Sequence, residues 1–145
     1  MTPYVVRLIP QSDITLFENI RDAVHRLPDI DLGTDEAGKK VELSCHMLAR
    51  AVGKVFPVSC IDGYFYPHYQ HSWIRTVNWN IIDVYPVGIL GGPILVDGNI
   101  IYAPGKFLYL RKNTTQISQG RFSKASFRRA VREIMRILAD VARKE

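Results

Sequence analysis

The sequence predicts a single α+β domain over residues 1–145, in which helices pack against an antiparallel sheet. The chain has 145 residues, of which 47% are apolar and 23% charged, and these values are typical of one globular domain. Two amphipathic helical patterns come first, a series of short apolar runs with turn residues follows, and a third helical pattern ends the chain. Helices that are segregated from the strands in this way are typical of the α+β class.

The first helix is predicted over residues 14–27, because apolar side chains recur there at spacings of three and four. Ser12 and Asp13 are expected to cap its start, and Pro28 ends it. Residues 29–40 hold glycines and mixed charge without periodicity, which predicts a loop. The apolar stripe consists of Leu16, Ile20, Val24 and Leu27.

A second amphipathic helix is predicted within residues 41–56, and Pro57 terminates it. Its start is ambiguous, because Thr34 or Asp35 could cap a long helix, whereas Ser44 could cap a shorter helix that begins at Cys45. The apolar positions are Leu43, Met47, Leu48, Ala51, Val52 and Val55.

The centre of the chain is predicted to be rich in strands, and Asp97-Gly98 has the composition of a two-residue hairpin turn. The candidate strands are residues 58–66, 70–76, 81–85, 94–96, 100–102 and 107–110. A last helix is predicted from Ser123 onward, with its apolar side in the core and its arginines exposed. The apolar side carries Phe127, Ala130, Val131, Ile134, Leu138 and Val141, and the other side carries Arg128, Arg129, Arg132, Arg136 and Arg143.

The net charge of +5 is confined to the last helix and its flanks. Residues 1–120 hold 11 basic and 11 acidic side chains, whereas residues 121–145 hold 8 basic and 3 acidic ones. A neutral body without a nucleic-acid-binding motif makes nucleic acid an unexpected partner. No apolar run approaches the roughly 20 residues that cross a bilayer, so no membrane association is expected.

The two cysteines do not form a disulfide framework, and the N-terminus lacks the pattern of a secretory signal. We therefore expect a cytoplasmic protein with free thiols. No cofactor is expected, and the sequence leaves the oligomeric state open.

Three residues in order, Cys45, His71 and Asp83, could form a nucleophilic triad. A cysteine reacts as the thiolate, which the positive end of a helix favours. A nearby imidazole can deprotonate the thiol and later protonate the leaving group, and a carboxylate on the other ring nitrogen would orient that imidazole. Asp83 stands between Ile82 and Val84, where an unpaired charge would be costly to bury, and this also favours a partner.

The triad makes a demand on strand register, because His71 and Asp83 must lie on the same face of a hairpin. A four-residue loop, 77–80, would place them on opposite faces. A five-residue loop, 75–79, would pair them directly, and a three-residue loop, 77–79, or a bulge would make them diagonal neighbours. The hypothesis therefore predicts an odd loop or a bulge.

Four ordered stretches resemble the core of a known enzyme family. They are Cys45 with the following Ala49-Arg50-Ala51-Val52-Gly53, then Asp62-Gly63-Tyr64, His71-Ser72-Trp73 and Asp83-Val84-Tyr85-Pro86. In this order they resemble the transglutaminase-like cysteine proteases and acyltransferases, which have the papain-like fold. The resemblance implies a transglutaminase-like core and a catalytic triad of Cys45, His71 and Asp83. It also implies a hydrolase or acyltransferase that forms a thioester with a peptide or protein amide.

The same residues allow two other interpretations. Zinc held by Cys45, His68, His71 and Asp83 is disfavoured, because an H-x-x-H spacing on a strand sends the two rings to opposite faces. A non-catalytic module, whose basic last helix binds nucleic acid or an acidic partner, is the alternative function.

Several neighbouring residues are expected to have structural roles. Cys60 is expected to be structural, and His25 and His46 to be surface or packing residues. The glycines of residues 88–92 are expected to permit a bend near the site. An oxyanion hole would use the backbone N–H of Cys45 with Gln70, Trp79 or Tyr64, and nothing in the sequence chooses among these three.

Overall fold

The computed structural model describes residues 9–66, 69–86, 88–89, 91–98, 108–112 and 123–143. Its helices are α1 (Gln11–His25), α2 (Cys45–Val55) and α3 (Lys124–Arg143). Its strands are β1 (Ser59–Phe65), β2 (Tyr69–Arg75), β3 (Ile81–Asp83), β4 (Ile94–Val96) and β5 (Tyr109–Arg111). The described strands form one antiparallel sheet, which confirms the α+β class.

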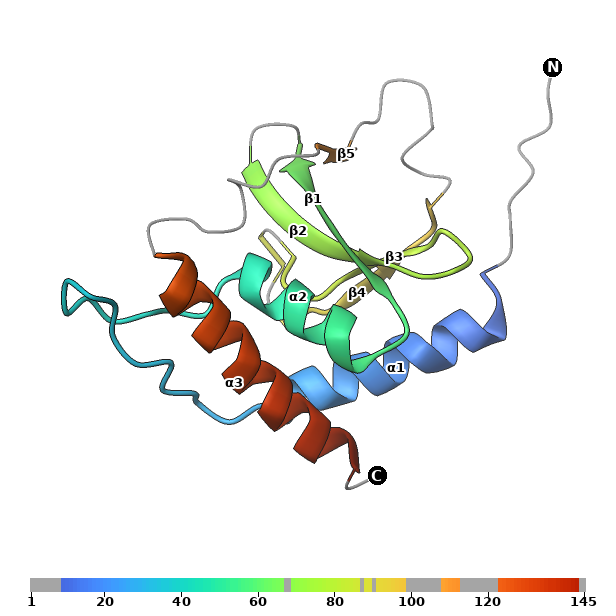
Figure 1. Ribbon diagram of the computed structural model, residues 1–145. Coiled ribbons are helices and arrows are strands. Elements are labelled where there is room, and N and C mark those ends of the chain that lie inside the picture. Colours follow the sequence, from blue (N-terminus) through green and yellow to red (C-terminus); the bar gives the residue numbers. More distant parts are fainter. Residues whose placement is uncertain are drawn as a thin grey trace, which may run out of the picture.

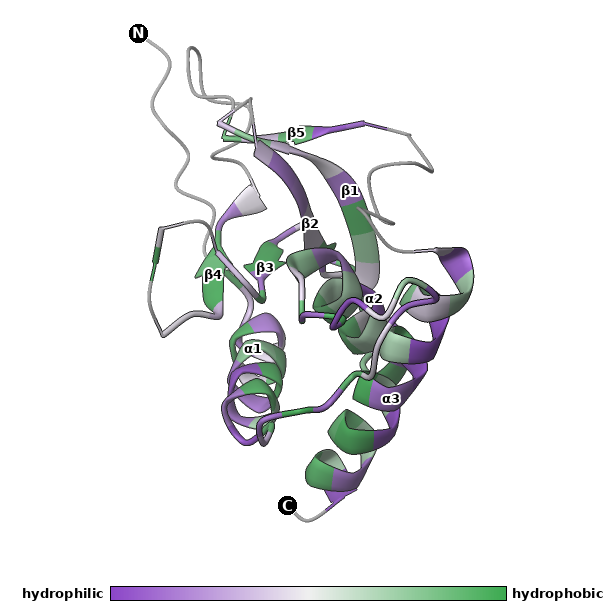
Figure 2. Ribbon diagram, turned by 90° about the vertical axis from the view of Figure 1, so that its left-hand side faces the viewer, coloured by the Kyte–Doolittle hydropathy of each residue, from purple (hydrophilic) through white to green (hydrophobic). Residues whose placement is uncertain are grey.

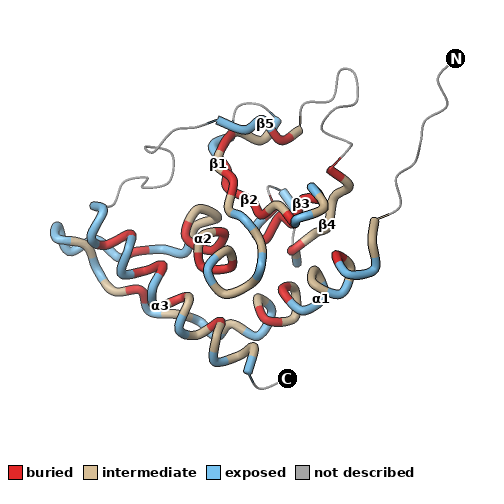
Figure 3. Tube along the Cα trace, turned by 45° about the vertical axis from the view of Figure 1, so that its right-hand side comes forward, coloured by how far each residue is buried: buried red, intermediate tan, exposed pale blue. Residues whose placement is uncertain are grey.

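The sheet has the order β4-β3-β2-β1-β5, and the three helices cover one of its faces (Figure 1). The main core lies between these two layers, where α2 packs against both α3 and the central strands. Burial is accordingly concentrated where the helices and the sheet meet (Figure 3). A smaller cluster lies on the other face of the sheet and consists of Ile61, Trp73, Ile81 and Tyr109.

The start of α1 differs from the prediction. Pro10 is the N-cap residue and supplies no side-chain cap, so Ser12 and Asp13 lie inside the first turn. Asp13 is only 2% exposed. Its carboxylate accepts hydrogen bonds from Thr76, Asn78 and Asn80 at 2.7–3.1 Å. The predicted cap was wrong because this carboxylate anchors α1 to the β2–β3 turn instead of capping its own helix.

The shorter alternative for α2 is confirmed. Ser44 is the N-cap residue, and its hydroxyl accepts a hydrogen bond from the backbone N–H of Met47 at 3.3 Å. Asp35 organises its own loop instead, since it accepts hydrogen bonds from the N–H groups of Ala37 and Lys39. The helix therefore begins at Cys45, which places this cysteine at its positive end.

The predicted strands exist where the structure describes them, with bounds shifted by one or two residues. β3 ends at Asp83, two residues earlier than predicted. The predicted strand at residues 100–102 lies outside the described residues, as does Phe107 at the start of the last predicted strand. The second arm of the hairpin predicted at Asp97-Gly98 therefore lies outside them as well.

α3 has the predicted amphipathic character, with a hydrophobic side and a hydrophilic side (Figure 2). Its buried apolar residues include Phe127, Ile134 and Leu138, and Val141 packs at the margin of the core. Its arginines are exposed, as predicted, and the Arg129 guanidinium also donates hydrogen bonds to the carbonyls of Leu32 and Thr34. Among the described residues, no helix is both long and apolar enough to span a membrane.

Candidate active site

The head of α2 carries the candidate nucleophile. Cys45 is the first residue of this helix and its side chain is partly buried. The Ser44 hydroxyl accepts a hydrogen bond from the Met47 N–H, and the Ser44 carbonyl accepts one from the Leu48 N–H. The N–H groups of Cys45 and His46 precede these two at the start of the helix. Unsatisfied N–H groups and the helix dipole both favour negative charge here, which is the requirement of a thiolate.

The β2–β3 turn has the odd length that the triad demands. Thr76 N–H donates to the Asn80 carbonyl at 2.9 Å, and this closes a three-residue loop over 77–79. Trp79 ends the loop with a φ of 67°. An αL residue at the third loop position is typical of three-residue hairpin loops. The resulting register pairs Ile74 with Ile82, so His71 and Asp83 become diagonal neighbours on one face. The register prediction is confirmed.

His71 and Asp83 form a buried pair. Nε2 of the ring lies 2.9 and 2.8 Å from the two oxygens of Asp83, and the side chains are 1% and 0% exposed. The Tyr109 hydroxyl donates to Asp83 Oδ2 at 2.9 Å, and the backbone N–H of Tyr85 donates to Oδ1 at 3.3 Å. Burial raises the pKa of the Tyr109 hydroxyl above its ordinary value, and the nearby Asp83 carboxylate raises it further, so this group remains a donor. The Asp83 carboxylate, which was expected to need a partner, is thus bonded to three groups: the His71 ring, the Tyr109 hydroxyl and the Tyr85 N–H.

Aromatic side chains fix the plane of the His71 ring. Trp73 stacks on it at 6.1 Å between centroids with an interplanar angle of 28°, and Phe65 meets it edge-on at 6.0 Å. Since Nε2 is occupied by Asp83, Nδ1 is the ring nitrogen left for the hydrogen bond between His71 and the Cys45 thiol. The structure therefore brings all three predicted residues together, in the order thiol, imidazole and carboxylate.

The electrostatics of this arrangement favour an ion pair. Burial by itself raises the pKa of the Cys45 thiol, but hydrogen bonds and positive charge from His46 and His71 outweigh burial and lower the pKa to about 6. Burial by itself lowers the pKa of His71, but Asp83 and Cys45 outweigh it and raise the pKa to about 9. At neutral pH a thiolate then faces an imidazolium.

His46, which was expected to be a surface or packing residue, is partly buried and has a polar partner on β2. Its Nδ1 lies 2.7 Å from the Ser72 hydroxyl, which donates to Asp62 at 2.5 Å. Asp62 in turn pairs with Arg50 at 2.5 Å. His46 is also a hydrogen-bond neighbour of the Cys45 thiol. Adjacent residues of α2, Cys45 and His46, thus meet adjacent residues of β2. Sequence spacing could not reveal this, because it depends on how the helix lies on the strand.

The four stretches of the resemblance converge at this place for steric reasons. Arg50 of the first stretch donates hydrogen bonds to Asp62 of the second and Ser72 of the third. Gly63 lets β5 and Trp73 approach, because a Cβ there would lie 2.0 Å from the Leu110 carbonyl oxygen and 2.8 Å from the Trp73 ring. A side chain at this position would therefore displace the indole that stacks on His71.

The second cysteine has the opposite character. Cys60 is partly buried on β1, and burial raises the pKa of its thiol to about 11, with a smaller opposing effect from Arg50. This contrast agrees with the structural role expected for Cys60. Gly88 and Gly91 have positive φ, which is compatible with the bend expected there, and residue 90 lies outside the described residues. The described contacts of Gly91 and Gly92 are with α1, where His25 Nε2 lies 3.1 Å from their carbonyls.

The structure narrows the choice of oxyanion donors. Trp79 lies in the β2–β3 turn, beyond Arg75, and the four residues from Arg75 back to His71 span about 13 Å of strand. Gln70 and Tyr64 face each other in register at the His71 end of the sheet. They lie on the same face as Ser72, which contacts the head of α2. Gln70 and Tyr64 remain candidates, and Trp79 is too distant.

Within the part of the chain that the structure describes, no group of three or more His, Cys, Asp or Glu side chains is arranged to hold a metal ion. His68, which belonged to the zinc alternative, lies outside that part. Comparison of the chain with family models, with curated proteins and with solved structures finds no match. The class of site is therefore defined by its geometry alone, as a thiol, an imidazole and a carboxylate in hydrogen-bonded series.

Proposed function

We propose that this protein is a cysteine-dependent acyl-transfer enzyme of transglutaminase-like type, with Cys45 as nucleophile, His71 as general base and acid, and Asp83 as the orienting carboxylate. The observation that carries the proposal is the buried His71–Asp83 pair, bonded at 2.8 Å, whose imidazole also reaches a thiol at a helix N-terminus. A buried ion pair of this kind costs desolvation energy, so it is a poor way to stabilise a fold. It is the arrangement that thiol catalysis requires.

The reaction would proceed in two balanced halves. The Cys45 thiolate attacks the carbonyl carbon of an amide, a C–S bond forms, and the carbonyl π electrons move to oxygen. That oxyanion would be stabilised by the Cys45 N–H together with Gln70 or Tyr64. As the C–N bond breaks, His71 gives its proton to the departing amine, which leaves a thioester. Water or a second amine then loses a proton to His71 and displaces the thiolate.

The substrate class in this proposal is a peptide or protein amide. Water as acceptor gives a peptidase or amidase, and an amine as acceptor gives a transferase. Hydrolysis is favoured slightly, because water needs no second binding site. A reducing compartment such as the cytoplasm would keep the thiol free.

The decisive experiment detects the thioester. An activated ester, p-nitrophenyl acetate, should acetylate the wild-type protein with release of nitrophenolate, and peptide mass spectrometry should place the acetyl group on Cys45. Cys60→Ala should react like the wild type, whereas Cys45→Ala and His71→Ala should not. Acetylation of both thiols at equal rates would remove Cys45 from its role. The alternative function, a binding module without turnover, predicts no acyl-enzyme at all.

A further inference from the structure

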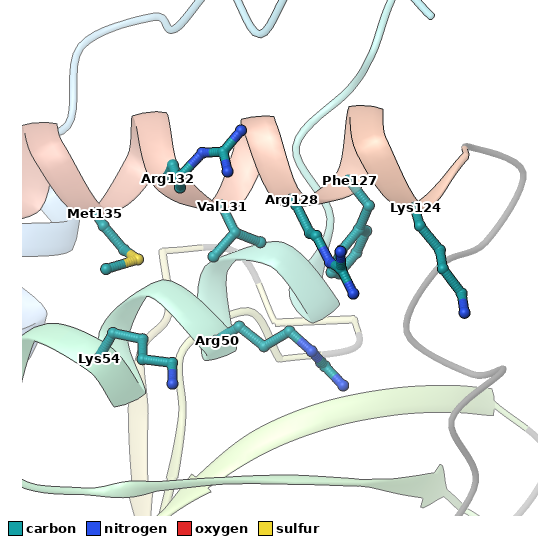
Figure 4. A pocket seen from close by; sticks show the side chains of 8 residues that line it. All are labelled: Arg50, Lys54, Lys124, Phe127, Arg128, Val131, Arg132 and Met135. Atoms are coloured by element: carbon teal, nitrogen blue, oxygen red, sulfur yellow. The ribbon is translucent and has the colours of Figure 1, made fainter.

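A groove of about 430 Å³ lies between α2 and α3, outside the residues of the proposed triad. Its volume falls within the roughly 300–1,000 Å³ of typical ligand pockets. None of the residues that line it is acidic. Figure 4 shows Arg50 and Lys54 along α2, with Lys124 and Arg128 extending from α3 toward them. The cationic lining residues are Arg50, Lys54, Lys124, Arg128 and Arg132.

The cations of α3 form a regular row. Lys124, Arg128 and Arg132 are four residues apart, which repeats their positions about every 6 Å along the helix. Like charges at this spacing disfavour a helix unless an anion offsets them. Glu133 of the same helix does not offset them, since it pairs with Arg136 at 2.6 Å. The row therefore favours an external anionic partner.

The apolar part of the groove defines what kind of anion fits. Phe127 and Val131 form its floor, where they are only 6% and 9% exposed, and Met135 continues the same four-residue spacing as a partly exposed side chain. The Arg50 guanidinium lies 5.6 Å from the centre of the Phe127 ring. A nucleic-acid backbone would engage the cations but offer no apolar surface to these side chains. A helix with an acidic row beside an apolar row satisfies both, because its side chains repeat with the spacing of α3.

We propose that this groove binds an acidic amphipathic helix of another protein. Acidic side chains at positions i, i+4 and i+8 of that helix would lie against Lys124, Arg128 and Arg132. Its neighbouring apolar row would cover Met135 and the small parts of Phe127 and Val131 that line the groove. This is the helix-in-groove mode of recognition, with charge complementarity setting the orientation.

The groove also leads toward the candidate site. Arg50 lies five residues, or about 7.5 Å, along α2 from Cys45. It joins the groove to the chain of Asp62, Ser72 and His46 beside the thiol. If the protein is the enzyme proposed above, the acidic helix would belong to its protein substrate. The identity of the partner as a substrate rests on that proposed function, whereas the binding of an acidic helix does not.

Binding can be tested without turnover. The probe is a fluorescent Ala-based peptide of about 18 residues, long enough to form a helix in solution, with Glu at every fourth position and Leu beside each Glu. Fluorescence anisotropy should show binding to the full chain that weakens with salt. Replacing the peptide's Glu by Gln, or its Leu by Ser, should each weaken binding about tenfold or more.

The matched protein variants distinguish the groove from general charge. The double variant Lys124→Glu/Arg128→Glu should lose about tenfold or more in affinity. Arg136→Glu/Arg143→Glu carries the same charge change on the same helix outside the groove, and should bind within about twofold of the wild type. Equal losses in the two variants would overturn the proposal, as would tighter binding of a single-stranded oligonucleotide of equal charge. Circular dichroism melting curves check that each variant is folded, and no binding by folded wild type also overturns it.

Discussion

The Cys45 thiol has two histidine neighbours, which differ in their further partners. His71 continues to a buried carboxylate, and so can accept, hold and return a proton. His46 continues through the Ser72 hydroxyl to Asp62, which is already paired with Arg50. The first chain has the geometry that the proposed proton transfer needs, whereas the second places a fixed polar group beside the sulfur. Both lower the pKa of the thiol.

The first prediction concerns the pH dependence of thiol reactivity. The rate of alkylation of Cys45 by iodoacetamide should rise with pH around a midpoint near 6, because the thiolate forms as the pH passes the thiol pKa of about 6. Cys60, with a pKa of about 11, should react much more slowly at neutral pH. Turnover should follow a bell-shaped profile whose upper limb falls near 9, as the pair loses the imidazolium proton. Peptide mass spectrometry across a pH series measures both thiols, and a Cys45 midpoint above pH 8 would contradict the ion pair.

The second prediction separates the two histidines. His46→Gln should raise the midpoint for alkylation of Cys45, because a hydrogen bond and a positive charge beside the thiol are lost. It should retain measurable formation of the acetyl-enzyme, since His71 still carries the proton. His25→Gln is the matched control, as that ring contacts only the carbonyls near residue 91 among the hydrogen bonds described, and its midpoint should be unchanged. An unchanged midpoint in His46→Gln would mean that His46 has a packing role only.

At the scale of elements, the β2–β3 turn decides whether the candidate site can form. A change of one residue in this loop would move Asp83 to the opposite face of the sheet from His71. Asp13 of α1 holds the turn from outside, through Thr76, Asn78 and Asn80. Although α1 does not carry the thiol, it therefore supports the register on which the proposed triad depends.

The third prediction tests this support. Asp13→Ala should lower the free energy of unfolding by about 2–5 kcal/mol, because buried donors in the turn lose their acceptor. It should also reduce the rate of Cys45 acetylation more than other substitutions of similar stability cost. Asp22→Ala, on the exposed part of α1 beside Arg21, should change stability by less than about 1 kcal/mol. Urea denaturation measures both variants, and equal stabilities would show that the Asp13 cluster contributes nothing.

At the scale of the whole molecule, α3 completes the core. It packs on α2, which in turn packs on the sheet, so removing α3 would expose the helix that carries Cys45. Four of its apolar side chains, Phe127, Ile134, Leu138 and Val141, each contribute about 1.5–3 kcal/mol when fully buried. Their sum is comparable to the roughly 5–15 kcal/mol of stability that a typical domain has.

The fourth prediction follows from this packing. A chain truncated after Gly120 should be unfolded, as judged by circular dichroism and by loss of a cooperative melting transition. The triple variant with Gln at Arg128, Arg132 and Arg136 should melt within about 3 °C of the wild type, because these guanidinium groups are exposed. A truncated chain that still melts cooperatively would make α3 an appended arm instead of part of the core.

The sequence by itself determined the class of fold and most of the elements, and it pointed to the three residues of the candidate site. Periodicity, caps and prolines act locally, so the stripe of α3 and the Ser44 cap could be predicted from neighbours in the chain. The sequence also determined what the β2–β3 loop had to be if His71 and Asp83 were to meet. It could not show whether this loop has three, four or five residues, because the same stretch of sequence can form each of them.

Only the tertiary structure decided the roles that depend on distant partners. Asp13 stands in the sequence where a helix cap is expected, but its carboxylate anchors the β2–β3 turn. It accepts hydrogen bonds from side chains more than 60 residues away instead of from the backbone N–H groups of its own helix. His46 has the sequence of a surface residue, and becomes a neighbour of the thiol through the way α2 lies on β2. The lowered pKa of the thiol and the cationic groove likewise depend on charged and polar groups from separate elements. These groups act on one another only after folding has brought the elements together.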